Sequence, residues 1–365
     1  MNKQLFGFRK SFLLHMLIPG LVLLLIAESC DTSREEADWM NEDNMSISQY
    51  LQNNQEEYSK FAMLLDKAKL LNTLYAYNPY GTDYTLFLPT NEAIDHFISQ
   101  NQVYDSFEDL LNDTSFIKTI GRYHILNRKV HTDEFPDGAL EDMTLTGERL
   151  VTGFYAEGNN QLIKVNNKAP VITSNLKMTN GYIHVITEVL QQVKITGYDW
   201  LQQQQEYSIL AQAVKLSGIK SRLWWKKYTI LAEHDSIYKR NGINNVEDLV
   251  KRIATPGMPV TDKNNAFNLF AAYHFLGGEF YLNDLYWGNK SYTNLAGKLL
   301  TINVGVDIQI NKGIDVYGYN ISSSGDTTFI DYIKPIWVKS NIMTSTGPVH
   351  SINNILFYEP LPEAQ

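Results

Sequence analysis

The sequence predicts an α+β fold made of two similar domains in tandem, and three observations lead to this prediction. Segments of the chain recur in the same order roughly 150 residues further on, which is typical of an internal repeat. Helical patterns lie early in each copy, and short alternating strand patterns lie late. The chain has 365 residues, which is long enough for two hydrophobic cores.

Residues 1–29 are typical of a secretory signal peptide. Lysine and arginine residues precede an apolar run from Phe12 to Ala27, and Pro19 and Gly20 interrupt that run. The run is too short and too broken to cross a bilayer as a helix, so we expect it to direct export.

The run ends at the sequence LIAESC, which resembles the lipobox of Bacteroidetes-type lipoproteins, although Glu28 departs from the stricter form of that pattern. The resemblance implies that Cys30 is acylated and anchors the mature protein to a membrane. Each CH₂ group of an acyl chain that enters the bilayer contributes roughly 0.8 kcal/mol to the free energy of membrane binding. Residues 30–45 are acidic and are expected to form a tether, which in such lipoproteins resembles a surface-export signal. The expected location is the outer face of the outer membrane, and the alternative is a soluble secreted protein.

Composition argues against several classes of function. The net charge of −9 and the absence of a concentrated basic face argue against nucleic-acid binding. Because Cys30 is the only cysteine, the chain can form neither an internal disulfide nor a cysteine metal cluster. The eight histidines lack the spacing of a metal site, so we expect neither a metal nor a cofactor.

The repeat is visible in four pairs of segments. YSKFAMLLDKAKL aligns with YSILAQAVKLSGI at an offset of 149, and TLFLPTNEAI aligns with YTILAEHDSI at an offset of 143, which places Asn91 opposite His234. GRYHILNRKV aligns with AAYHFLGGEF at 150, and SNLKMTNGYIH aligns with SNIMTSTGPVH at 166. Each copy is expected to contain an amphipathic helix, a buried strand (YTLFL or YTILA), another helix (FEDLLND or VEDLVKRI), short alternating strands and a closing Gly-x-[Ile/Val]-His strand.

The segments TLFLPTNEAI, YHILNRKV and TNGYIHVITEVL resemble, in this order, the conserved boxes of the fasciclin domain. The second copy is more divergent, because TILAEHDSI lacks the Pro-Thr-Asn of the first. The resemblance implies two fasciclin-like β-wedge domains with flanking helices, over residues 46–193 and 194–361. It also implies adhesion or binding at a cell surface, since this is what most members of the family do.

The motif residues are interpreted as structural. Gly181 and Gly347 are expected to allow close backbone approach, and the histidines to be buried and hydrogen-bonded, with Thr179, Asn180 and Asn91 as partners of His184. In animal members of the family a Tyr-His pair is implicated in integrin binding, but burial is the preferred interpretation here. The motif residues are Asn91, Tyr123, His124, Gly181, His184, Tyr273, His274, Gly347 and His350.

No catalytic motif is present, so we expect the protein not to be an enzyme. Neither Gly-x-Ser-x-Gly nor His-Glu-x-x-His occurs, and there is no glycine-rich phosphate loop. Glu233, His234 and Asp235 would alternate faces along a strand, so they are interpreted as a polar junction between a strand and a helix rather than as a metal site.

Two aromatic segments are the candidate binding residues. The second copy carries an insertion at about residues 313–338, which is expected to form a β-hairpin. Two adjacent tryptophans precede YTILA, the first expected strand of the second copy. The alternative for both segments is packing within their own domain. The candidates are Trp224, Trp225, Tyr317, Tyr319, Phe329, Tyr332 and Trp337.

Two functions follow from these observations. The first is a cell-surface lipoprotein that acts as a non-catalytic adhesion or binding module, with a protein or glycan partner. The alternative is an accessory lipoprotein of a Sus-type, TonB-dependent outer-membrane importer of glycans or peptides, bound to its β-barrel transporter through the hairpin.

Overall fold

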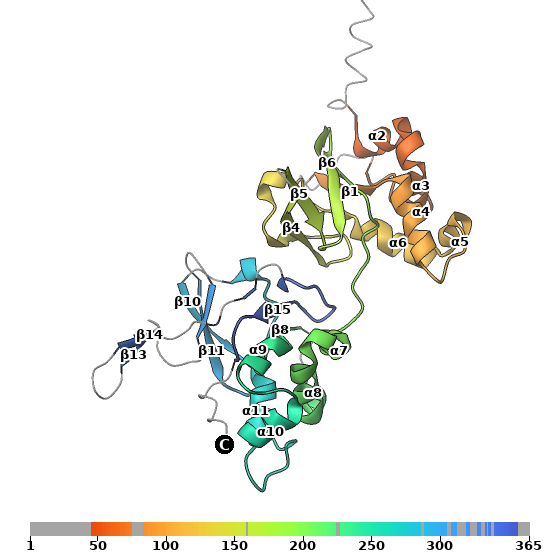
Figure 1. Ribbon diagram of the computed structural model, residues 1–365. Coiled ribbons are helices and arrows are strands. Elements are labelled where there is room, and N and C mark those ends of the chain that lie inside the picture. The colour runs from red at the N-terminus through yellow and green to blue at the C-terminus, as the bar shows by residue number, and fades with distance from the viewer. Residues whose placement is uncertain are drawn as a thin grey trace, which may run out of the picture.

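The computed structural model describes residues 45–74, 83–157, 160–223, 227–285, 288–304, 308–311, 319–321, 327–329, 333, 335–336 and 339–356. They form two α+β domains that follow each other along the chain (Figure 1). We call α2 to β7 the first domain and α7 to β15 the second domain. The predicted α+β class is confirmed, with helices flanking the sheets of each domain.

The α-helices of the first domain precede most of its strands in the chain, and four of them begin at side-chain caps. Ser46 and Gln49 form a capping box, and Thr90, Ser106 and Asp113 each accept a bond from a backbone N–H of the first turn. The helices are α2 (Ile47–Asn53), α3 (Gln55–Lys67), α4 (Asn91–Gln100), α5 (Phe107–Asn112) and α6 (Thr114–Tyr123), and a short 3₁₀ helix, η2, spans Thr132–Glu134.

The sheet of the first domain has the strand order β2-β1-β7-β6-β5-β4-β3. Every residue of β1 is buried, and β1 runs parallel to β7 with Leu86 opposite Ile183. The strands are β1 (Tyr84–Pro89), β2 (Ile125–Leu126), β3 (Gly138–Met143), β4 (Arg149–Glu157), β5 (Asn160–Val165), β6 (Ala169–Met178) and β7 (Gly181–Ile186). The helices cover one part of this sheet with a core that includes Phe61, Leu64 and Leu65 of α3.

The second domain has a similar order of helices and strands, but its described strands form separate sheets instead of one. Its helices are α7 (Gly197–Gln203), α8 (Ser208–Leu216), α9 (Asp235–Arg240), α10 (Val246–Ile253) and α11 (Ala266–Tyr273), with the 3₁₀ helices η3 (Gln205–Tyr207), η4 (Ile219–Arg222) and η5 (Leu282–Asp284). One sheet has the order β15-β8-β9, built from β8 (Tyr228–Glu233), β9 (Phe275–Gly277) and β15 (Val349–Ile352). A second sheet has the order β10-β11-β12, from β10 (Gly288–Thr293), β11 (Leu299–Val304) and β12 (Ile308–Asn311).

The strand register shows how the two copies correspond. Leu86 pairs with Ile183 in the first domain, and Ile230 pairs with Val349 in the second, again in parallel. The predicted alignment of Asn91 with His234 is therefore wrong by one residue: Thr90 corresponds to His234, and Asn91 to Asp235. Thr90 and His234 are both N-caps, of α4 and α9.

Hydrogen bonds confirm this correspondence of Asn91 with Asp235. The side chain of Asn91 accepts a bond from the backbone N–H of Lys60 at 2.9 Å, and the side chain of Asp235 accepts one from the backbone N–H of Ile209 at 2.9 Å. Each therefore ties the helix after the buried strand to the preceding helix, α3 or α8.

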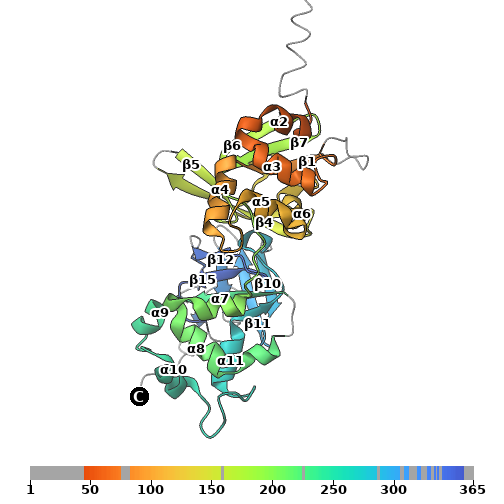
Figure 2. The same cartoon turned by 90° about the vertical axis from the view of Figure 1, so that its right-hand side faces the viewer.

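The two domains contact each other at a junction that joins β3 and β4 of the first domain to η5 of the second. Arg149 forms a two-pronged ion pair with Asp284, at 2.7 and 2.9 Å, and both side chains are about four-fifths buried. Asn283 accepts a bond from the N–H of Ala139 and donates one to its carbonyl oxygen. In both views β4 lies at the end of the first domain that faces the second (Figures 1 and 2).

Some predicted features lie outside the described residues. These are the signal segment 1–29, Cys30, most of the acidic tether, Trp224, Trp225, Tyr317, Tyr332 and Trp337. Within the predicted insertion, β13 (Tyr319–Ile321) pairs antiparallel with β14 (Thr327–Phe329), and the backbone of Tyr319 lies opposite that of Phe329. In the described part of the chain, no helix combines the length and the apolar character needed to cross a membrane.

Candidate functional site

The Tyr-His pair of the first domain lies at the end of α6, with the histidine in the core. Nδ1 of His124 donates to the carbonyl oxygen of Ile120 at 2.9 Å, because a carbonyl can only accept, and Nε2 accepts from the N–H of Leu190 at 3.0 Å. Burial lowers the pKa of His124 to about 4. The imidazole is therefore neutral and joins the end of α6 to the segment after β7.

Tyr123 is also buried, but its edge reaches a surface cleft. Its hydroxyl oxygen accepts a bond from Nδ2 of Asn166 at 3.1 Å, and burial raises the pKa of Tyr123. Tyr123 nevertheless lines the cleft described below. Because Tyr123 is only 1% exposed, it helps to shape the cleft but offers almost no free surface, and its hydroxyl group is engaged within the domain.

His184 and His350 occupy matching places in the two closing strands. Nδ1 of each accepts a bond from a backbone N–H, that of Asn175 at 3.2 Å or Asn341 at 3.1 Å. Nε2 of each donates to a carbonyl oxygen, that of Val130 at 3.0 Å or Phe280 at 2.8 Å. Burial lowers the pKa of both histidines to about 4, so both hold segments of their own domain together as neutral rings.

The predicted partners of His184 are wrong. Asn180 instead accepts a bond from the N–H of Ile47 and donates to the carbonyl oxygen of Leu74, and thereby holds the start of α2. Asn91 is bonded to α3, as described above. Asn175 lies within β6, where the register with β7 shifts, and its positive φ of 61° brings its backbone N–H to the imidazole.

In the second domain, His274 has a different partner from its counterpart His124. Nδ1 donates to the carbonyl oxygen of Phe270 at 2.8 Å, but Nε2 faces a carboxylate oxygen of Glu233 at 2.9 Å. Tyr273, Glu233 and His274 are all buried. Glu233 is thus the last residue of β8 and part of the core, while His234 caps α9, so the three residues of the Glu-His-Asp sequence do not converge.

The two motif glycines lie where neighbouring backbone comes closest. A Cβ atom on Gly181 would overlap the carbonyl oxygen of Tyr84 on β1, and one on Gly347 would overlap that of Tyr228 on β8. Gly347 also has a φ of +129°, which L side chains rarely adopt. The glycines therefore allow the first and last strands of each domain to approach each other.

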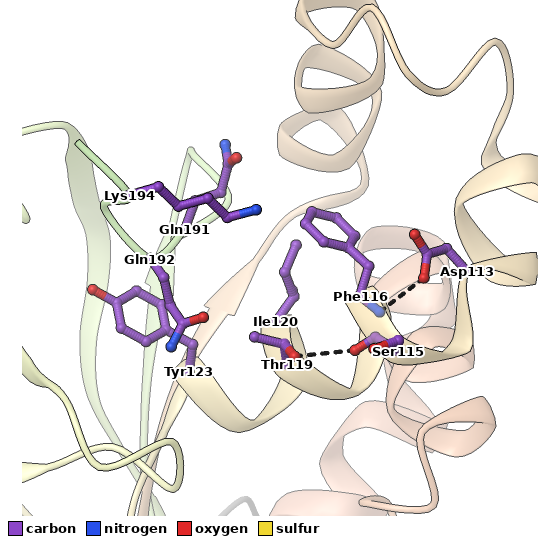
Figure 3. A pocket seen from close by; sticks show the side chains of 9 residues that line it. All are labelled: Asp113, Ser115, Phe116, Thr119, Ile120, Tyr123, Gln191, Gln192 and Lys194. Atoms are coloured by element: carbon purple, nitrogen blue, oxygen red, sulfur yellow. Dashed lines mark hydrogen bonds between the residues drawn. The ribbon is translucent and has the colours of Figure 1, made fainter. Parts of the chain in front are cut away.

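A cleft of about 600 Å³ lies between α6 and the segment that follows β7, and we call it the α6 cleft. Phe116 and Ile120 of α6 form one side, and Gln191, Gln192 and Lys194 form the other. Figure 3 shows Lys194 and Gln191 reaching over the cleft from the segment after β7.

The polar groups of the α6 cleft fall into two sets. Asp113 accepts from the N–H of Phe116 and from the hydroxyl of Tyr104, both at 2.9 Å, and so is engaged within the domain. In the described part of the chain, no hydrogen bond or ion pair engages the side chains of Gln191, Gln192 or Lys194. The cleft therefore presents two amides and an ammonium group beside an apolar wall, and these groups can bind a partner without breaking internal bonds.

Sequence reasoning missed the α6 cleft because its two sides lie about 70 residues apart and carry no motif. The one local signal is the change from the apolar end of β7 to the polar sequence QQVK, residues 191–194. Among the described residues, no group of three or more His, Cys, Asp or Glu side chains could hold a metal ion.

Comparison with known proteins identifies the first domain. Residues 56–192 match the model of the fasciclin domain family. This segment, from α3 to just beyond β7, is therefore a fasciclin domain, and the resemblance inferred from its three sequence boxes is confirmed.

Relatives of the chain include animal proteins of greater length. It is 23% identical over 274 residues to transforming growth factor-beta-induced protein ig-h3 of Sus scrofa, covering 75% of this chain and 34% of that protein. It is 22% identical over 275 residues to periostin of Homo sapiens, covering 75% and 28%. It is 30% identical over 109 residues to stabilin-2 of Rattus norvegicus, covering 30% and 7%. The chain thus spans about a third or less of the length of these relatives.

Among solved structures, the chain is similar to a FAS1 domain pair from the insect cell adhesion molecule fasciclin I. The sequence identity is 17% and the TM-score is 0.35, with 82% of this chain and 96% of that chain covered.

Proposed function

We propose that this protein is a non-catalytic binding module of the cell surface, which adheres to a partner through the α6 cleft of its fasciclin domain. We further propose that acylated Cys30 anchors it to the outer membrane, with the domains facing the cell exterior. The sequence at residues 1–45 supports the anchor, and the fasciclin domain supports the adhesive role.

The unengaged Lys194, Gln191 and Gln192 beside Phe116 carry this proposal. The motif histidines offer no comparable surface, since His124, His184, His274 and His350 are all buried and bonded within their own domains. An ammonium group above an apolar wall fits an acidic group on a protein or glycan, with the aromatic ring supplying apolar contact area.

The test is adhesion of cells or purified matrix to the full-length protein and to two charge-reversed variants. Lys194→Glu places a negative charge over the cleft, whereas Lys118→Glu changes an exposed lysine of α6 that does not line it. We expect Lys194→Glu to reduce binding at least tenfold and Lys118→Glu to leave it within twofold. Equal loss in both variants, or none in either, would contradict the proposal.

A second candidate function is favoured by the β13–β14 hairpin. In Figure 1 this hairpin stands away from β10 and β11, and Tyr319 and Phe329 lie opposite each other on it. Such a projecting element suits docking onto a β-barrel transporter of the outer membrane, as an accessory subunit of an importer. A pull-down of the tagged protein from its own membrane in mild detergent tests this function. A barrel recovered in equal amount, and lost on deletion of residues 313–340, would establish it, and recovery of the protein alone would exclude it.

A further inference from the structure

A second cleft lies between the two domains, beside the junction, and we call it the interdomain cleft. Its volume is about 320 Å³, at the lower end of the usual range for small-molecule sites. The first domain contributes Asp137, Tyr155 and Asn167, and the second contributes Trp200, Glu206 and Lys339. None of these residues lines the α6 cleft.

Hydrogen bonds across the domains fix the wall of this cleft. Nδ2 of Asn167 donates to the carbonyl oxygen of Asn341 at 3.2 Å, and Nδ2 of Asn341 donates to that of Asp137 at 3.4 Å. Oδ1 of Asn167 accepts from the hydroxyl of Tyr155 at 3.0 Å. The site is therefore ordered before a ligand arrives, and it exists only while the domains keep this arrangement.

The lining combines aromatic rings with planar polar groups. Tyr155 and Trp200 come from opposite domains and are both half-buried, with Trp200 also 5.8 Å from the ring of Tyr207. The carboxylate of Asp137 has no hydrogen-bond or ion-pair partner among the residues that the structure describes. Partial burial raises the pKa of Asp137, in agreement with a position at the cleft wall.

The charges indicate the class of ligand. Lys339 lies 3.6 Å from Glu206, which also contacts His234 at 3.4 Å. Among the described residues of the lining, the one ammonium group therefore already faces a carboxylate. An anionic ligand would meet Asp137 and Glu206, and a purely apolar one would leave Asp137 without a partner. A neutral ligand with several hydroxyl groups and an apolar face can donate hydrogen bonds to the carboxylate and pack against the aromatic rings.

We propose that the interdomain cleft binds a neutral saccharide, with its hydroxyl groups on Asp137 and Asn167 and an apolar ring face against Tyr155 or Trp200. This site goes beyond the proposed adhesive role of the α6 cleft and does not depend on it.

The experiment measures binding of the purified full-length protein to a printed array of neutral oligosaccharides of the gluco-, manno-, xylo- and N-acetylglucosamine series. The strongest ligand is then titrated by calorimetry. We expect Asp137→Ala to weaken binding at least tenfold without loss of thermal stability, because its carboxylate makes no bond to any residue that the structure describes. Tyr155→Ala should weaken binding further. Lys194→Glu, in the α6 cleft, should leave saccharide affinity within twofold.

Failure to bind any saccharide of the array at millimolar concentration would overturn this proposal, as would binding that survives both Asp137→Ala and Tyr155→Ala. Loss of saccharide binding in Lys194→Glu alone would place the sugar in the α6 cleft, and would likewise overturn it. The adhesion assay with Lys194→Glu and Lys118→Glu tests the α6 cleft and does not depend on saccharide binding. The two proposals can therefore fail separately.

Discussion

Glu233 inserts a buried carboxylate between His274 and the backbone N–H of Leu356. Nε2 of His274 lies 2.9 Å from the carboxylate, the N–H of Leu356 donates to it at 2.6 Å, and the hydroxyl of Tyr238 bonds to it at 2.9 Å. In the first domain the corresponding histidine, His124, accepts directly from the N–H of Leu190. Because Nδ1 of His274 already donates to Phe270, one proton must lie between His274 and Glu233.

Removal of this carboxylate should destabilise the second domain strongly. Glu233→Ala leaves His274, Tyr238 and the N–H of Leu356 without their partner inside the core, so we expect a loss of about 3–5 kcal/mol in the free energy of unfolding. Urea unfolding measures this loss. The matched control is Glu279→Ala, which breaks an exposed ion pair with Lys227 and should cost about 1 kcal/mol or less. Similar costs in the two variants would contradict a role for the buried pair.

Stability should fall in mild acid because three histidines stay neutral in the folded protein. The pKa values of His124, His184 and His350 are lowered to about 4, against about 6.5 in an unfolded chain. Between these values the unfolded state binds protons that the folded state does not, so stability is fully present above pH 6.5 and is lost as pH falls toward 4. At pH 5, each histidine should cost about 2 kcal/mol relative to pH 7.5.

Urea unfolding between pH 5 and pH 7.5 measures this slope. Proton resonances of the three imidazoles provide the direct check, since they should not titrate above pH 5. Titration of these resonances near pH 6.5 would refute the assignment.

The ion pair between Arg149 and Asp284 should hold the domains in their arrangement. Among the described residues, Asp284→Ala leaves the mostly buried guanidinium with the carbonyl oxygens of Leu140 and Ala139 as its hydrogen-bond partners. We therefore expect a loss of about 2 kcal/mol in the free energy of unfolding and separate unfolding of the two domains. Calorimetry detects the separation, and small-angle scattering detects a larger radius of gyration. Asp95→Ala removes a more exposed pair with Lys60 and should change neither measurement. A compact variant with a single transition would show that the ion pair does not couple the domains.

Gly181 and Gly347 should tolerate no side chain. In Gly181→Ala the new methyl group overlaps the carbonyl oxygen of Tyr84, which forces β7 away from β1, and we expect a loss of about 3 kcal/mol or more. Gly147→Ala is the matched control, because Gly147 has a φ of +84° but no atom of the described residues lies within 4 Å of the added Cβ; it should cost about 1 kcal/mol. Chemical unfolding compares the two, and equal costs would assign the effect to backbone conformation rather than to strand approach.

The repeat and the order of helices and strands could be predicted because local patterns carry them. The buried strands β1 and β8 appear in the sequence as short apolar runs, and α10 as an amphipathic segment after its cap Asn245. The alignment of TLFLPTNEAI with YTILAEHDSI is wrong by one residue, because apolar letters in neighbouring strand positions match almost equally well. The parallel strand register and the hydrogen bonds of Asn91 and Asp235 separate the two alignments.

The partners of His184 and the two clefts could not be predicted for a different reason. The partners of His184, namely Asn175 and Val130, are set by an irregularity within β6 with a positive φ and by a segment 54 residues away. The α6 cleft and the interdomain cleft likewise combine residues that are distant in sequence, and neither Lys194 nor Asp137 belongs to a motif. Their positions follow from packing, which a single sequence does not contain.

The parallel pairing of β1 with β7 determines when the first domain can fold during synthesis. Leu86 lies in a fully buried strand whose partner, Ile183, emerges roughly a hundred residues later, so the sheet cannot close until nearly the whole domain is available. The second domain repeats the delay between Ile230 and Val349. Each nascent domain therefore exposes its first apolar strand until its last strand arrives. A chain truncated before residue 181 or 349 should be a substrate for chaperones and proteases rather than a shortened binding protein.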